Sequence, residues 1–224
     1  MTRLLLSALA LATIAAVPGL AQDTRIDARL DPATAAEVRS ALATARNQGL
    51  PLEPLIDRAL EGASKGASSG RIVAAVRALL NNLSRAAQAL GPDAAERELV
   101  AGAEALRAGA DSATLAAIRG ARRGEPVTVP LGVLTDLVAR GVPADAAREA
   151  VLALARRGAR DGDFLALRRN VERDIQQGAP PAIAASVRAR GLPSTLPPGA
   201  PGAAGPGATT ERTAPAGTAT PPRP

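Results

Sequence analysis

Apolar residues recur between residues 31 and 191 at the spacing of about 3.6 that is typical of an α-helix. Val127-Thr128-Val129 is the only short run that resembles a strand, and it ends in Pro130, which has no amide hydrogen for a sheet. The pattern therefore predicts an all-α fold. We expect about nine short helices, over residues 32–48, 52–64, 70–90, 92–108, 112–121, 130–140, 143–157, 162–177 and 180–190.

Glycines mark the ends of these helices. A glycine followed by Leu, Val or Ala and then by Pro, Ser or Asp occurs at Gly49, Gly66, Gly109, Gly141 and Gly178. Glycine adopts the left-handed conformation that ends many helices, and an apolar residue after it packs back on the last turn. Asp31 and Asp111 have the side chain and the position of helix N-caps. The chain is thus predicted to form tight helical hairpins.

A longer repeat is indicated by a shift of 92 residues, which aligns residues 49–72 with residues 141–164 at seven identical positions, including Gly49 with Gly141 and Pro51 with Pro143. We interpret this as a duplication. Stacked hairpins form α-solenoids, because each hairpin has an apolar face that it cannot bury alone. The intervals are irregular and match no tetratricopeptide, ankyrin or HEAT consensus, so an α-solenoid-like stack and an irregular compact bundle both remain open.

The predicted core consists mainly of Leu, Ile and Val, with small alanines that allow close helix packing. Phe164 is the one large aromatic ring, and we expect it to be buried. The expected core residues are Leu55, Ile56, Leu60, Ile72, Val73, Val76, Leu79, Leu80, Leu83, Leu99, Leu106, Leu115, Ile118, Leu134, Leu137, Val138, Val151, Leu152, Leu154, Leu165, Leu167, Val171 and Ile175.

The two ends of the chain differ from this region. Arg3 followed by the uncharged stretch Leu4–Val17, with small residues before a cut after Ala21, has the layout of a secretory signal peptide. From Pro193 onward the chain is almost entirely Pro, Gly, Ala and Thr, a composition typical of a disordered tail. We therefore expect a signal peptide at 1–21, a linker at 22–30, the helical domain at 31–191 and a tail at 192–224.

The amino-acid composition limits the kinds of catalytic and metal-binding sites that the chain can form. The 224 residues include no Cys, His, Tyr or Trp, so thiolate or imidazole catalysis, a disulfide and a Cys/His zinc site are excluded. The 27 Lys and Arg outnumber the 21 Asp and Glu, giving a net charge of +6. Arginines and carboxylates are interspersed along the chain, with arginine doublets such as Arg122-Arg123 and no aromatic partner beyond Phe164. This favours solvated helix faces over a nucleic-acid site.

The loop Glu61–Gly70 holds the only Lys, Lys65, beside serines and glycines. A phosphate-binding loop needs a different order of residues after a strand, and a Ser-x-x-Lys nucleophile fails because Gly62 stands three residues before Lys65. We interpret the segment as an interhelix loop with Ser69 as the N-cap of the next helix.

Carboxylates give no better candidate for chemistry. Asp161-Gly162-Asp163 begins like a calcium loop but lacks the later ligands, so it is interpreted as a helix N-terminus. Glu96 and Glu98, two residues apart on a helix, do not face each other. We expect Asp23, Asp27 and Asp31 to be solvated, and we discount the glycosylation sequon Asn82-Leu83-Ser84 because it falls inside a predicted helix.

By elimination, the sequence predicts an exported, non-enzymatic helical protein without catalytic, cofactor-binding or metal-binding residues, serving as a protein-interaction scaffold outside the cytoplasm. The partner is an unknown protein, with no role for nucleic acid and no membrane span once the signal is cleaved. An alternative is a structural protein of the cell envelope, whose arginines contact an anionic wall polymer or lipid surface. A more remote alternative is a hydrolase that uses carboxylates alone.

Overall fold

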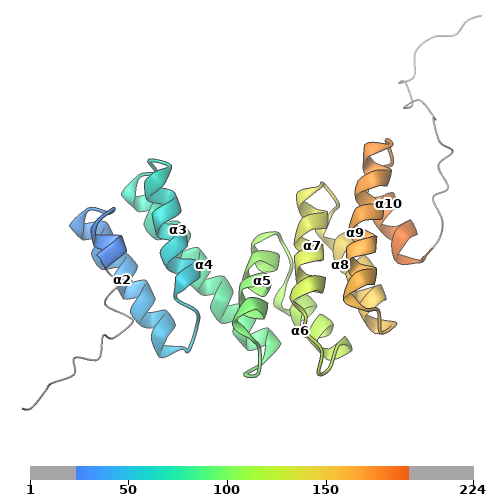
Figure 1. Ribbon diagram of the computed structural model, residues 1–224, viewed down its shortest axis with the longest axis horizontal. Helices are drawn as coiled ribbons and strands as arrows, with labels where there is room; N and C mark the ends of the chain where they lie inside the picture. The colour runs from blue at the N-terminus through green and yellow to red at the C-terminus, as the bar shows by residue number, and fades with distance from the viewer. Residues whose placement is uncertain (1–23, 192–224) are drawn as a thin grey trace, which may run out of the picture.

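The computed structural model describes residues 24–191 and confirms an all-helical fold, with no strand in this range. A helical turn at residues 24–27 precedes nine helices, in the predicted order (Figure 1). They are α2 (Pro32–Asn47), α3 (Glu53–Ser64), α4 (Ser69–Leu90), α5 (Glu96–Arg107), α6 (Ser112–Ala121), α7 (Thr128–Ala139), α8 (Ala144–Arg156), α9 (Asp161–Gln176) and α10 (Pro181–Ala189). The predicted signal peptide and tail lie outside the described residues.

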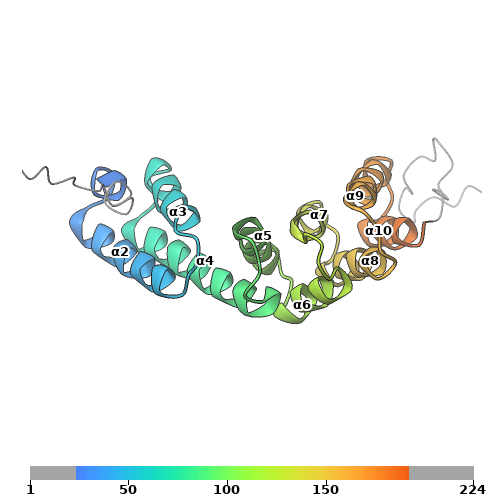
Figure 2. The ribbon, with the colours of Figure 1, turned by 60° about the horizontal axis from the view of Figure 1, so that its bottom comes forward.

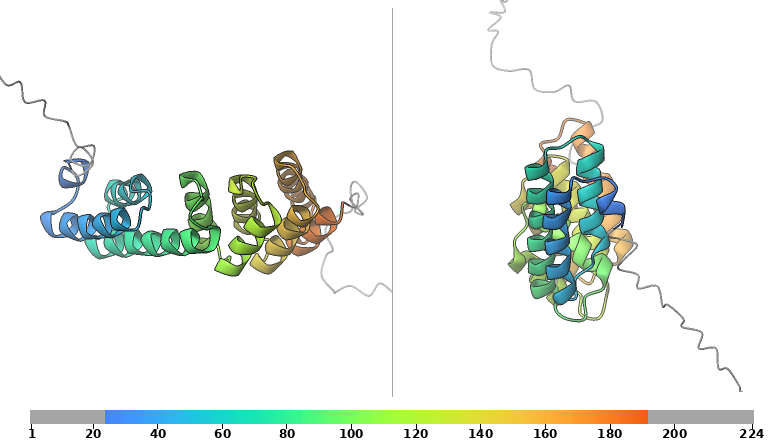
Figure 3. Two further views of the ribbon diagram at one scale, coloured as in Figure 1. Left: turned by 90° about the horizontal axis from the view of Figure 1, so that it is seen from below. Right: turned by 90° about the vertical axis from the view of Figure 1, so that its left-hand side faces the viewer.

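The helices form two layers. The even-numbered helices α2 to α10 pack in sequence, each on the next even helix, and form one curved row. The odd-numbered helices stand on the concave side of this row (Figure 2), and α5, α7 and α9 pack on one another there. Two further views show all four odd helices projecting from the same side of the even row (Figure 3). The loops from an even to an odd helix lie along the lower edge of Figure 1, which we call the loop edge.

Helix α4, with 22 residues, is the longest helix within residues 24–191, and it packs against α2, α3, α5 and α6. Helices α3 and α5 both stand on it, and an ion pair of 3.6 Å between Arg58 and Glu104 joins them. The close packing of α5 on α4 depends on Gly102, whose position leaves no room for a larger side chain against Ala86.

The five predicted glycine turns are confirmed. Gly49, Gly66, Gly109, Gly141 and Gly178 all have φ between 65° and 108°. The amide after each glycine donates to the carbonyl five residues earlier, as Leu50 does to Ala45 at 2.9 Å and Val142 to Leu137 at 3.1 Å. This bond pattern satisfies carbonyls that the end of a helix leaves unpaired. It also turns the chain sharply, which is why successive helices lie in opposite layers.

The spacing of the helices differs from the shift seen in the sequence. Helices α5, α7 and α9 begin at residues 96, 128 and 161, at intervals of 32 or 33 residues, whereas α3 begins at residue 53 and breaks this spacing. The predicted duplication of 49–72 at 141–164 instead superimposes α3 on α8, which belong to opposite layers. A common ancestry of the two segments therefore stays a prediction, separate from the geometric repeat.

Burial follows the predicted apolar pattern. None of the expected core residues is fully exposed, and Phe164 is completely buried, as predicted. The sequence missed Ile26, which is 0% exposed although it lies in the segment expected to be a linker. Eight further buried Leu and Val residues are absent from the expected core, and three of them, Val127, Leu131 and Val133, surround the predicted start of α7. The other five are Val38, Leu42, Leu50, Leu90 and Val142. That helix begins at Thr128 rather than at 130, because Pro130 is tolerated in a first turn whose amides need no helical acceptor.

Candidate functional site

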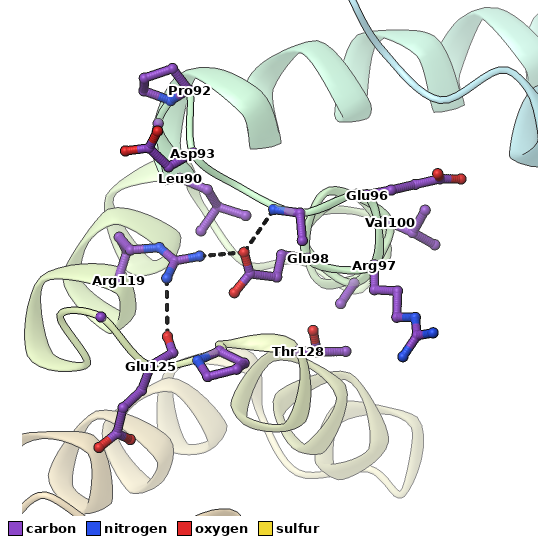
Figure 4. A pocket seen from close by; sticks show the side chains of 15 residues that line it. Leu90, Pro92, Asp93, Glu96, Arg97, Glu98, Val100, Arg119, Glu125 and Thr128 are labelled. Atoms are coloured by element: carbon purple, nitrogen blue, oxygen red, sulfur yellow. Dashed lines mark hydrogen bonds and ion pairs between the residues drawn. The ribbon is translucent and has the colours of Figure 1, made fainter.

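A groove of about 1270 Å³ opens at the loop edge, between the α4–α5 loop and the α6–α7 loop (Figure 4). We call it the loop-edge groove. Its apolar lining comes from Leu90, Pro92, Val100, Ala101 and Pro126. Its charged lining comes from Asp93, Glu96, Arg97, Glu98, Arg119 and Glu125. A smaller hollow of about 490 Å³ lies beside Arg25 and Glu61 at the N-terminal end of the array.

Glu98 holds the two walls of the groove together. It lies in the first turn of α5, and its carboxylate accepts the amide hydrogen of Ala95 at 2.9 Å and that of Val127 at 2.8 Å. Ala95 belongs to the α4–α5 loop and Val127 to the α6–α7 loop. One side chain therefore fixes the distance between both loops, which makes the groove a preformed feature of the fold.

Arg119 of α6 supplies the counter-charge. Its Nη2 lies 2.7 Å from the Glu98 carboxylate, and its Nη1 donates to the carbonyl of Glu125 at 3.1 Å. The Glu98 side chain is only 8% exposed. Burial raises the pKa of Glu98, but Arg119 and the two backbone amides outweigh it, so the pKa lies below its ordinary value and the side chain is ionised at neutral pH.

Beside the groove, Arg122 corrects the interpretation of the arginine doublets as solvated. Arg123 is exposed, but Arg122 is 4% exposed and stands over the Phe164 ring, with its guanidinium carbon 5.2 Å from the ring centre. Arg122 donates to the Ala159 carbonyl at 2.6 Å and to Asp161 at 2.8 Å. It thereby joins the end of α6 to the start of α9.

A similar bond recurs one helix pair later. Arg157, which follows the last residue of α8, donates to the carbonyl of Ala189 at the end of α10 at 3.0 Å. In both cases an arginine after one even helix satisfies a carbonyl at or just beyond the end of the next. These bonds join neighbouring helices of the even row and so stabilise their stacking. The arginines also place positive charge near the negative ends of the helix dipoles, which is favourable.

The Glu61–Gly70 loop connects α3 to α4, as predicted, but its cap differs by one residue. Ser68 occupies the N-cap position, and Ser69 Oγ instead donates to the Asp31 carboxylate at 3.0 Å. Lys65 pairs with Glu61 at 2.6 Å. The only lysine is therefore one half of an exposed ion pair within the helix end.

The carboxylates considered in the sequence separate into distinct roles. Asp161 and Asp163 lie at the N-terminus of α9, as predicted, where Asp163 accepts the amide hydrogen of Arg160 at 2.8 Å. Glu96 and Glu98 do not form a pair, since Glu98 is buried and the exposed Glu96 points away from it (Figure 4).

Three aspartates and one glycosylation sequon remain from the sequence analysis. Asp27 pairs with Arg39 at 3.0 Å, and Asp31 caps α2 by accepting from Ala33 and Thr34. Asp23 lies outside the described residues. The sequon at Asn82 falls inside α4, as expected, and its Ser84 is hydrogen-bonded to Gln48 at 2.5 Å.

Across residues 24–191, no group of three or more acidic side chains has the arrangement of a metal site. None of the helices in the same range has the length and apolar character needed to cross a membrane. Comparisons with protein-family models, with curated proteins and with solved structures found no match. The loop-edge groove is therefore the feature on which a functional proposal rests.

Proposed function

We propose that the protein is a non-enzymatic interaction scaffold, built as an α-solenoid, that binds a polypeptide segment of a partner in the loop-edge groove. The observation that carries this is the groove itself, with about 1270 Å³ of space, an apolar lining and walls fixed by Glu98. Sites for single small molecules are typically about 300–1,000 Å³, so an open groove of this size suits a stretch of chain. Curved stacks of helix pairs commonly present such binding surfaces.

A selection from a random decapeptide library on the purified chain tests this function. Val100→Asp places a charge in the groove, and we expect it to abolish enrichment of the peptides that the unsubstituted chain selects. Ile183→Asp is the matched control, because Ile183 is 57% exposed on α10, outside the groove. Peptides that are enriched equally by all three chains would contradict a binding role for the groove.

The envelope-associated alternative has its own supporting observation. Arg123, Arg156 and Arg160 are all exposed and belong to the ends of even helices and the loops that follow them. We expect this version to give salt-sensitive sedimentation with anionic vesicles or cell-wall polymer. Arg123→Gln/Arg156→Gln should reduce it more than Arg71→Gln/Arg173→Gln, which removes two exposed arginines elsewhere.

Export belongs to the same proposal. Arg3, the apolar stretch Leu4–Val17 and the small residues before Gln22 support secretion with cleavage after Ala21. Intact-mass measurement of the protein recovered from the periplasm of a bacterial host should give a chain that begins at Gln22. Leu9→Arg, which interrupts the apolar stretch, should keep the chain inside the cell.

A further inference from the structure

The charge of the loop-edge groove is opposite in sign to that of the chain. The chain as a whole carries +6, but the groove is lined by four carboxylates and two guanidinium groups. Glu98 and Arg119 neutralise each other at 2.7 Å, and Glu125 pairs with Arg122 at 2.9 Å. Asp93 and Glu96 are both exposed and form no ion pair with any described residue, which leaves them against Arg97 alone.

The position of these two carboxylates relative to the apolar lining matters. In Figure 4, Asp93 lies to one side of Glu98, beside Leu90, while Glu96 lies to the other side, near Val100, on the same side as Arg97. A segment laid across the groove thus passes apolar side chains between two carboxylates. An apolar surface flanked by unpaired negative charge favours an apolar ligand that carries positive charge.

We infer that the groove binds a short segment with apolar residues next to a lysine or arginine, donated by another protein. This inference rests on the proposed function and adds the chemistry of the partner. An acidic segment is disfavoured, because its carboxylates would lie against Asp93 and Glu96 in a partly desolvated groove. Of the two guanidinium groups in the lining, Arg119 is paired with Glu98 and only Arg97 is left opposite Asp93 and Glu96, so the matching cation is supplied by the ligand.

The test uses the library selection on three full-length chains. These are the unsubstituted chain, the groove variant Asp93→Asn/Glu96→Gln, and the control Asp57→Asn/Glu149→Gln, which removes two exposed carboxylates outside the groove. We expect the unsubstituted chain and the control to enrich peptides with Lys or Arg beside apolar residues. Two exposed charge pairs should contribute about three- to tenfold in affinity, so fluorescence anisotropy of an enriched peptide should show that loss for the groove variant only.

The effect of salt provides a second measurement. Added salt should weaken the peptide's binding to the unsubstituted chain and to the control, and it should weaken binding to the groove variant much less. Replacing the peptide's Lys or Arg by Gln should lower its affinity for the unsubstituted chain by a similar factor. The same replacement should have little effect on its affinity for the groove variant.

Failure of the basic-ligand inference can be distinguished from failure of the scaffold function. Enrichment of acidic or neutral peptides, or an equal loss of affinity in the groove variant and the control, would overturn the inference of a basic ligand but not the proposed peptide-binding scaffold. Self-association of the chain that is lost in the groove variant would identify a second copy as the occupant and also overturn it. Ala101→Arg is a second substitution in the groove lining. If neither Val100→Asp nor Ala101→Arg changed the set of enriched peptides, the scaffold function would be overturned as well.

Discussion

Gly102 of α5 lies so close to α4 that a β-carbon added to it would stand 3.0 Å from the β-carbon of Ala86. The added atom would also lie 3.1 Å from Leu115 and 3.2 Å from Leu90. The leucine side chains can turn aside, but the Ala86 β-carbon is fixed to the α4 backbone. The contact therefore sets the distance between the two helices.

Substitution at Gly102 should test this contact. Gly102→Leu should lower the free energy of unfolding by about 1–3 kcal/mol, because the core has no space for the added atoms. Gly132→Ala is the control, since Gly132 lies within α7 with nothing within 4 Å of an added β-carbon. Alanine should raise the free energy of unfolding there by about 0.5–1 kcal/mol. Urea denaturation followed by circular dichroism measures the free energy of unfolding of both variants. If Gly102→Ala raised this free energy as much as Gly132→Ala does, α5 would be able to move away from α4, and the contact would not set the distance between the two helices.

Phe164 should be the most costly single truncation. The ring is completely buried, and Phe164→Ala should lower the free energy of unfolding by about 3 kcal/mol through lost burial and a cavity. A thermal melt that does not change would place the ring outside the core.

The pair of Arg122 and Phe164 can be examined by a double-mutant cycle. Arg122→Met keeps an apolar stem and removes the guanidinium, which stands 5.2 Å from the ring centre. The single substitution should cost about 2 kcal/mol, because it also removes bonds to Ala159 and Asp161. The coupling free energy between Arg122→Met and Phe164→Leu should be about 0.5–1 kcal/mol. Additive single and double substitutions would show that the ring and the cation do not interact.

Glu98→Gln should loosen both loops of the groove. The amide offers one acceptor oxygen in place of two, and it leaves Arg119 without its counter-charge. We expect a loss of about 2 kcal/mol in the free energy of unfolding, with faster amide hydrogen exchange at Ala95 and Val127. Glu149→Gln, on the exposed face of α8, should leave both measurements unchanged.

Asp31 should make stability depend on acidity. Hydrogen bonds from the Thr34 hydroxyl and amide and from Ser69 lower the pKa of Asp31 from 3.8 to about 2. A lowered pKa contributes stability that is fully present above pH 3.8 and is lost as the pH falls towards 2. The difference in melting temperature between the unsubstituted chain and Asp31→Ala should therefore become smaller as the pH falls from 5 to 2. A constant difference across this range would show that the carboxylate is not the stabilising group.

Local signals explain why the helices could be predicted from the sequence. The glycine turns and the caps at Asp31 and Asp111 depend on residues close together in the chain, so these helix ends could be recognised individually. The sequence pattern predicts the start of α5 four residues too early, at 92, because the N-cap is Ala95, which has no polar side chain, and the capping carboxylate is that of Glu98. Only the reach of Glu98 back to the Ala95 amide defines that end.

The groove and the two layers depend on contacts distant in sequence. Glu98 meets Val127 across 29 residues, and Arg122 meets Asp161 across 39. Nothing local distinguishes Arg122 from Arg123, or Glu98 from Glu96. The interval of 32 or 33 residues also holds only between α5, α7 and α9, because the 22-residue α4 makes the interval from α3 to α5 longer.

The length of α4 has a consequence for how the chain opens. Helices at the ends of such an array, such as α10, can detach after losing a single layer of neighbours, whereas α4 is held by α2, α3, α5 and α6. In stacked helical arrays, stability is close to a sum of nearest-neighbour terms, and unfolding spreads along the stack. The amide protons of α4 should therefore exchange last, at a rate set by opening of the whole domain, whereas those at the ends of the array should exchange earlier through local unfolding.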